Sequence, residues 1–172
     1  MQYGLTASAI KRAKLDKLPE GTENDYRFVW EANYADICGK KLLIVVHAYT
    51  RYSMIYSDIK PAVWKDLKAF LHETVKLALA REGFSDEEIS KYFGMTQEEI
   101  ITRTHGKKAM GGLNHLTTYL SYMEKILVDG SFQSIITDDA NRDFCTSAIH
   151  PEISYVRPKE YFVQEMSKLL RG

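Results

Sequence analysis

The spacing of apolar residues changes near Pro61, and this change constrains the fold more than any single motif does. Before it, residues 26–35 alternate between two faces, one of which carries Tyr26, Phe28, Trp30, Ala32 and Tyr34. A period of two is typical of a half-buried strand. Residues 40–48 (KKLLIVVHA) are apolar on both faces and predict a central strand, and residues 52–57 predict a third. Their short connections predict an antiparallel meander, which MQYGL at residues 1–5 would extend to four strands.

After Pro61 the apolar residues recur at helical spacing. Residues 61–82 predict a long helix, because proline suits the first turn and Gly83 suits the position after the last. The sequence SDEE (85–88) is typical of a capping box between Ser85 and Glu88, so a short helix should follow. Apolar residues between 107 and 128 predict a further helix, and RPKEYFVQEMSKLL predicts a terminal one. The segment IITRT is ambiguous, because a capping signal precedes it but its composition favours a strand.

Together these elements predict a single α+β domain over residues 1–172. Its helices near 61–82 and 107–128 should cover an antiparallel sheet of three or four strands. No internal repeat, low-complexity tract or linker rich in proline or glycine divides the chain.

Charge and composition exclude several classes of function. Twenty-three basic residues balance twenty-three acidic ones, so we expect no strong sequence-independent binding to nucleic acid, which needs clustered cations. The longest apolar run, LLIVV, is too short to span a bilayer, and the first residues lack the apolar stretch of a secretory signal. Two cysteines outside any C-x-x-C pair fit a reducing compartment. We therefore expect a cytoplasmic protein without membrane contacts.

We expect neither a metal site nor a bound cofactor. The five histidines lack the paired spacing of zinc ligands, and His72 is expected to be solvated on its helix. The acidic segment DDANRD (138–143) lacks the glycine and the closing glutamate of a calcium loop, so we expect a solvated loop there.

The stretch TRTHGKKAMGGLNH (102–115) is the best candidate for a functional site. It is not a P-loop, because its glycines and lysines stand in a different order and no Ser or Thr follows Lys108. A helix that begins near Lys107 would place Lys107, Gly111 and Asn114 on one face, with Arg103 just before its free backbone amides. These are features of a site for a small anion or a phosphoryl group. Alternatively, the two glycines allow the helix to pack closely and the cations are solvated.

Parts of the sequence resemble an uncharacterised family of bacterial domains. W-E-A-N at 30–33 resembles a W-x-A-N strand of that family, which leads into a hydrophobic hairpin, and EGFSDEEISKYF at 82–93 resembles its helical segment. R-T-H-G-K-K-A-M-G-G-L-N-H resembles its segment (K/R)-T-x-x-(R/K)-x-(V/A)-(L/M)-G-(S/G)-x-N-(D/E). The matching residues are Trp30, Ala32, Asn33, Arg103, Thr104, Lys107, Gly111 and Asn114. The resemblance covers residues 1–127, leaves 128–172 as a C-terminal extension ending in a helix, and implies positions but no reaction.

The chain departs from that family's pattern at three places. It has TASAI where the family has T-K-K-L, and His47-Ala48 where the family has Asn-Asp after the central strand. It also has His115 where the family has an acid after the asparagine. If that acid is catalytic in the family, this chain has lost or altered the chemistry.

Three functional hypotheses are compatible with these patterns. The first is a small binding module that recognises an anionic ligand or a protein partner through Arg103, Thr104, Lys107, Gly111, Asn114 and Asn33. The second is a hydrolase or nuclease that acts on a phosphoryl group, with His47 or His115 as the base. The third is an accessory protein of a mobile element or bacteriophage that binds a host protein. The sequence has no carboxylate–histidine or metal pattern, and this favours the binding module.

Overall fold

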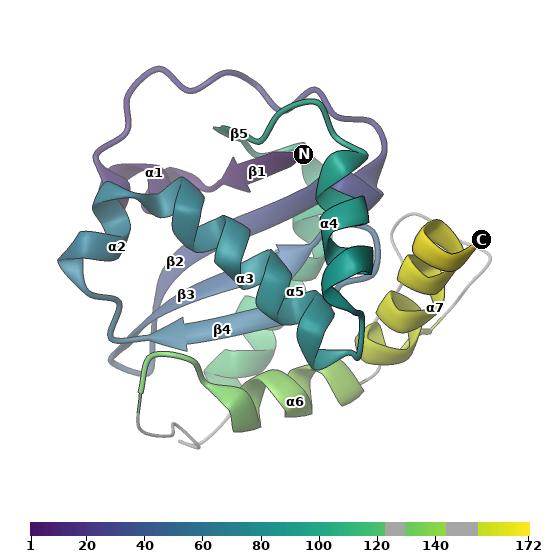
Figure 1. Cartoon of the computed structure of the whole chain (residues 1–172). Helices are drawn as coiled ribbons and strands as arrows, with labels where there is room; N and C mark the ends of the chain where they lie inside the picture. Colours follow the sequence, from purple (N-terminus) through teal and green to yellow (C-terminus); the bar gives the residue numbers. More distant parts are fainter. Residues whose placement is uncertain (123–129, 144–154) are drawn as a thin grey trace.

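A five-stranded mixed sheet forms the centre of the computed structural model, which describes residues 1–122, 130–143 and 155–172 (Figure 1). The strands are β1 (Gln2–Leu5), β2 (Val29–Ile37), β3 (Lys40–His47), β4 (Ser53–Ser57) and β5 (Ile100–Arg103), in the order β4-β3-β2-β1-β5. The predicted antiparallel meander is present as β2, β3 and β4.

The prediction of a purely antiparallel sheet is wrong, because β1 pairs in parallel with both β2 and β5. The connections explain the direction. Residues 6–28 contain helix α1 (Ala7–Ala13), which carries the chain back before β2 begins, and this allows parallel pairing. The ambiguous segment IITRT forms β5.

The predicted strand 26–35 begins later than expected, because residues 26–28 form the short 3-10 helix η1 (Tyr26–Phe28), capped by the side chain of Asp25. The other helices are α2 (Pro61–Lys65), α3 (Leu67–Arg81), α4 (Asp86–Gly94), α5 (Lys107–Tyr122), α6 (Ser134–Arg142) and α7 (Pro158–Arg171), and except for α6 they largely follow the sequence pattern. The capping box between Ser85 and Glu88 is confirmed. The predicted helix 61–82 is divided at Asp66, whose side chain caps α3. The predicted end of the helix 107–128 lies outside the described residues, which stop at Tyr122 before the gap.

The prediction of a solvated loop at residues 138–143 is wrong, because residues 138–142 belong to α6. Two buried side chains of this helix bind the edge of the sheet. Asn141 Oδ1 accepts a hydrogen bond from Ser53 N (2.8 Å), and Thr137 Oγ1 accepts one from Ile55 N (3.2 Å). These contacts satisfy backbone groups of the edge strand β4 and hold the helix in place.

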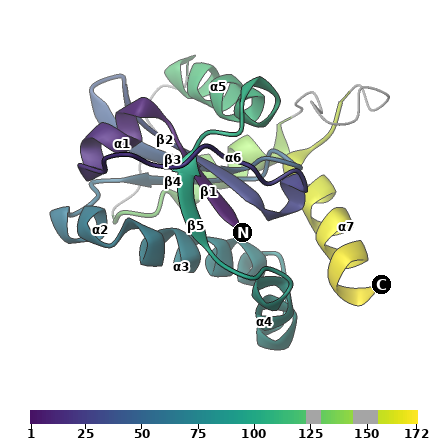
Figure 2. The same cartoon turned by 90° about the horizontal axis from the view of Figure 1, so that it is seen from above.

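Helices cover both faces of the sheet, as Figure 2 shows, with α5 on one side and α2, α3 and α4 on the other. The larger core lies on the side of α2, α3, α4 and α7. Trp30 is fully buried there, as predicted, and its ring packs against Phe162. The smaller core joins α5 and α6 to the opposite face of β3 and β4. Within the described residues, no helix is long and apolar enough to cross a membrane.

Candidate functional site

Arg51 connects the turn between β3 and β4 to the start of α5. Its backbone is left-handed (φ 69°), and the residue is only 6% exposed. The guanidinium donates from Nη1 to the carbonyl of Ala109 (3.0 Å) and from Nη2 to the carbonyl of Lys108 (3.1 Å). Both carbonyls belong to the first turn of α5, so the buried arginine fixes where this helix begins relative to the sheet.

The glycine pair of the GKKAMGG stretch makes room for this arginine. A Cβ atom on Gly112 would lie 2.4 Å from Arg51 Cδ, and one on Gly111 would lie 3.0 Å from Nη2. The distance of 2.4 Å is shorter than the non-bonded contacts that Cβ atoms make in proteins, so Arg51 would have to move. The close packing that the glycines allow is therefore packing against a charged side chain of the protein itself.

A cavity of about 150 Å³ opens beside this contact. It lies between α5, α6 and the start of α7, and its polar lining includes Arg51, Ser53, His115, Tyr119 and Asp143. The Tyr119 hydroxyl donates to Asp139 Oδ2 (2.6 Å), and burial together with this hydrogen bond raises the pKa of the phenol. The polar side chains of the site are therefore a guanidinium, an imidazole, two hydroxyls and one carboxylate.

The residues singled out from the sequence do not all meet at this cavity. Gly111 and His115 line it, one helical turn apart on α5. Lys107 and Asn114 are exposed and do not line it. Arg103 is also exposed, and its guanidinium pairs with Glu20 at 3.3 Å.

Asn33 and Thr104 lie elsewhere. Asn33 Oδ1 accepts hydrogen bonds from the hydroxyls of Thr6 (2.8 Å) and Ser8 (3.0 Å), and its amide reaches Thr117 of α5 (3.5 Å). These contacts tie β2 to the starting turn of α1 and to α5. Thr104 is half-buried in the short link between β5 and α5.

His47, one of the two candidate bases, is fully buried. Nδ1 lies 2.8 Å from the hydroxyl of Thr50, and Nε2 lies 3.0 Å from the carbonyl oxygen of Arg27. Burial lowers the pKa of His47 to about 4, so the ring is neutral near pH 7. A ring with both nitrogens bonded inside the core has the geometry of a structural histidine.

A buried histidine–glutamate pair lies where the sequence pattern indicated none. His105 Nδ1 and the His105 backbone amide both lie 2.8 Å from Glu31 Oε1, and the two side chains are 2% and 0% exposed. A Cβ atom on Gly4 would lie 2.3 Å from Glu31 Oε2, and one on Gly21 would lie 2.5 Å from the His105 ring. The available signal was a glutamate near the start of a strand, between the apolar residues Trp30 and Ala32.

The hydrogen bonds of Gln2 show how many protons His105 and Glu31 share. Its Oε1 accepts from the backbone amides of Thr22 (2.9 Å) and Glu23 (3.1 Å), which can only donate. His105 Nε2, 2.7 Å from the same oxygen, must therefore donate as well. One further proton lies between His105 Nδ1 and Glu31, so the pair carries no net charge. This lowers the cost of burying it.

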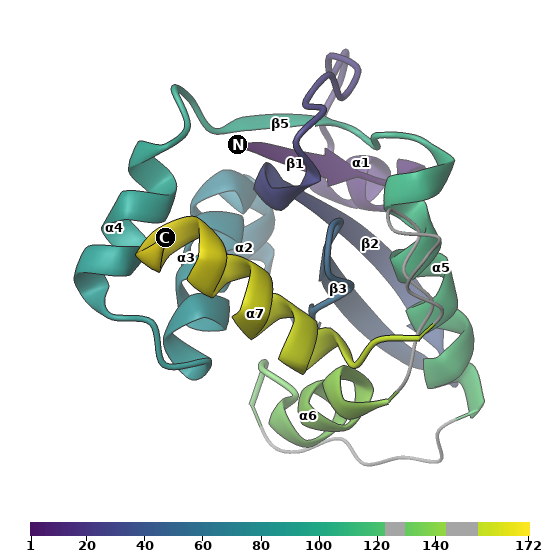
Figure 3. The same cartoon turned by 90° about the vertical axis from the view of Figure 1, so that its right-hand side faces the viewer.

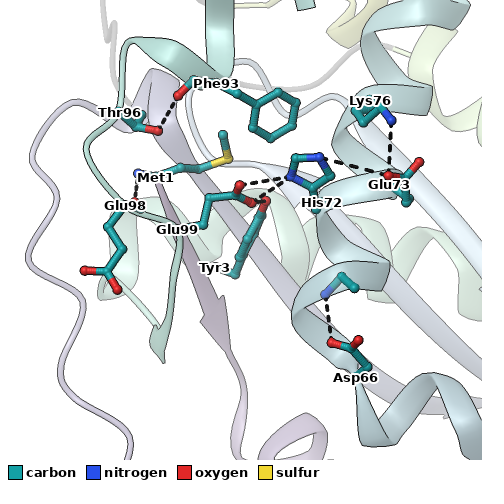
Figure 4. A network of polar contacts seen from close by, with 11 residues as sticks. Met1, Tyr3, Asp66, His72, Glu73, Lys76, Phe93, Thr96, Glu98 and Glu99 are labelled. Carbon is teal, nitrogen blue, oxygen red and sulfur yellow. Dashed lines mark hydrogen bonds and ion pairs between the residues drawn. The ribbon is translucent and has the colours of Figure 1, made fainter. Parts of the chain in front are cut away.

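A second histidine–carboxylate contact joins His72 of α3 to Glu99, as Figure 4 shows. His72 was expected to be solvated, but it is half-buried, and Nδ1 lies 2.9 Å from Glu99 Oε1. Glu99 also accepts a hydrogen bond from the Tyr3 hydroxyl at 2.5 Å. Burial and this hydrogen bond raise the pKa of Tyr3. The network ties α3 to β1 and to the segment before β5. Within the described ranges, no group of three His, Cys, Asp or Glu residues is arranged to hold a metal ion.

Comparison with protein families identifies one match that covers most of the chain. The family is described as a domain of unknown function, DUF6933, and its profile matches residues 2–161. This confirms the expected relation to an uncharacterised domain family. The match continues past residue 127, where the resemblance seen in the sequence ended. Neither the curated proteins nor the solved structures contain a significant match to the chain.

Proposed function

We propose that this chain, which belongs to the DUF6933 family, is a binding module for a small anionic molecule. The observation that carries the proposal is the cavity of about 150 Å³ lined by Arg51 and His115. It contains Gly111 and His115 from the stretch singled out in the sequence, but lies on a different flank of α5 from Lys107 and Asn114.

The volume limits the size of the ligand. A cavity of about 150 Å³ is large enough for a molecule the size of benzene, so the ligand or its enclosed part has roughly six to ten non-hydrogen atoms. Apolar walls from Leu116, Ala140 and Pro158 would surround its carbon atoms. Arg51 and His115 would face its anionic group, since both can donate hydrogen bonds. A small carboxylic acid has the required size and charge.

The hydrolase or nuclease alternative has weaker support. A histidine base is normally oriented by a second polar group. No hydrogen bond to His115 is present within the described residues, and His47 is enclosed in the core. We therefore favour binding without turnover.

A pair of neighbouring variants tests the location of the site. Thermal unfolding of the wild type would be followed with glycolate, acetate and inorganic phosphate at millimolar concentrations. His115→Ala should weaken the ligand response about tenfold, since a hydrogen bond to a charged group contributes about 1.5 to 3 kcal/mol. Asn114→Ala is the matched control, because Asn114 is also exposed on α5 but does not line the cavity.

The opposite pattern would contradict the proposal. If Asn114→Ala abolishes binding and His115→Ala does not, the ligand lies on the flank of Lys107. If no probe raises the unfolding temperature of the wild type, the cavity does not bind small anions.

A further inference from the structure

A second, cationic groove is lined by sequence neighbours of the cavity wall. The groove has a volume of about 740 Å³ and is lined by Arg142, Arg157 and Lys159, together with Glu160 and two uncharged residues. Arg142 directly precedes Asp143 of the cavity wall, and Arg157 and Lys159 flank Pro158 of the same wall. Figure 3 shows the end of α6 beside the start of α7, where these residues lie.

The charge around the cavity and the groove differs from that of the whole chain. Positive and negative residues are equal in number over the sequence. Among the described residues, the cavity and the groove together are lined by four side chains of the Arg and Lys type and by two carboxylates. A local excess of cations around a concave surface raises the concentration of anions there.

Two cations of the groove already form ion pairs with carboxylates of the protein, and a doubly charged anion can compete with an exposed one. Arg157 pairs with Glu160 at 3.0 Å, and Lys159 pairs with Glu82 at 3.2 Å. Both cations are close to half-exposed, and the Arg157–Glu160 pair, which is exposed on both sides, is weak. Glu82 is only 5% exposed, so Lys159 would keep this partner and contribute its remaining donors to the ligand. Arg142 is exposed and forms no ion pair within the described residues. A ligand group with two negative charges would compete well with Glu160 for Arg157.

We infer that the ligand of this cavity extends beyond it and carries a phosphate group, which binds Arg142, Arg157 and Lys159. The inference rests on the proposed function, because the enclosed part of the ligand occupies the cavity beside Arg51. A phosphate monoester has the chemistry that the groove selects. It carries nearly two negative charges at neutral pH, and its oxygens fit the planar donor fork of arginine. The ligand class is therefore a small phosphorylated carboxylic acid.

Isothermal titration of matched ligand pairs tests this inference. The phosphate esters are phosphoglycolate and 3-phosphoglycerate, which differ in length, and their unphosphorylated partners are glycolate and glycerate. Inorganic phosphate is the fifth probe. At least one ester should bind the wild type at least about tenfold more tightly than its partner, and the difference should shrink as salt rises.

Charge-removing variants then assign the phosphate to the groove. Arg142→Gln should remove most of the gain from the phosphate and leave the affinity for glycolate and glycerate unchanged. Lys168→Gln is the matched control, because Lys168 is an exposed cation of α7 with its own ion pair to Glu165 but does not line the groove. It should bind every probe as the wild type does.

The outcomes separate the two proposals. Equal affinity for both esters and their partners, with a His115-dependent response, would overturn the inference and leave the proposed function standing. Inorganic phosphate that binds as tightly as both esters would overturn the claim that cavity and groove hold one ligand. A wild type that binds no probe overturns both proposals, and an Arg142→Gln variant that keeps the phosphate gain overturns the inference alone.

Discussion

Replacing Gly112 with alanine should destabilise the protein, although alanine is the better helix former. Gly112 is buried in α5, directly against the stem of Arg51. The added Cβ would lie 2.4 Å from Arg51 Cδ and 2.8 Å from Nη1. The arginine cannot move aside freely, because its guanidinium is bonded to the carbonyls of Lys108 and Ala109.

The magnitude follows from three contributions. Helix propensity favours alanine over glycine by about 1 kcal/mol. Overpacking a tight contact costs about 1 to 3 kcal/mol. Because Arg51 is displaced as well, at least one hydrogen bond that contributes about 1.5 to 3 kcal/mol is lost. The sum of the three contributions is a loss of about 1.5 to 5 kcal/mol for Gly112→Ala. Gly111→Ala should change stability by less than about 1 kcal/mol, since its Cβ meets only the outer Nη2 atom at 3.0 Å.

Urea denaturation followed by circular dichroism would measure both variants. A double-mutant cycle with Arg51→Ala isolates the contact, because in that background the Gly112→Ala substitution should become stabilising by up to about 1 kcal/mol. The reasoning is refuted if Gly112→Ala is as stable as the wild type. It is also refuted if the loss is equally large in the Arg51→Ala background.

Three further predictions concern the core. Trp30→Ala should cost about 3 to 5 kcal/mol in urea melts, and a loss under about 1 kcal/mol would contradict its burial under α7. Because burial lowers the pKa of His47 to about 4 from an unfolded value of 6.5, only the unfolded chain takes up a proton between these values. Stability should therefore fall by about 3 kcal/mol as pH drops through that window, and His47→Gln should remove this slope. Glu31→Ala or His105→Ala should each cost about 3 to 5 kcal/mol in the same melts, whereas replacing both with leucine should cost less than the two single losses together.

The sequence pattern identified the strands better than their pairing. The meander of β2, β3 and β4 was predictable, because short connections force neighbouring strands to run in opposite directions. The parallel pairing of β1 with β2 and β5 was not, since four-residue strands carry little pattern and their partners are set by the helices between them. Contacts with the sheet also determine that residues 134–142 form helix α6. Asn141 and Thr137 stabilise that helix by binding backbone groups of β4, and no local signal in DDANRD reports this.

The candidate site was predictable in part, for a related reason. The glycines at 111 and 112 stood out as a place of close approach, and His115 stood out as a titratable residue beside them. The side chain that packs against the two glycines, Arg51, lies about sixty positions earlier in a turn that has no motif of its own. Long-range contacts of this kind depend on how α5 packs on the sheet, which a single sequence does not specify.

The two buried polar contacts around the start of α5 explain why the stretch resembles a ligand site. His105 is fixed by Glu31 just before the helix, and Arg51 is fixed by the carbonyls of Lys108 and Ala109 in its first turn. Both contacts require small or polar residues at closely spaced positions, as phosphate loops do. Here those residues position the helix, and the helix in turn shapes one wall of the cavity. The stretch therefore acts on the proposed ligand mainly by placing α5, and only Gly111, Gly112 and the residues one turn later reach the cavity itself.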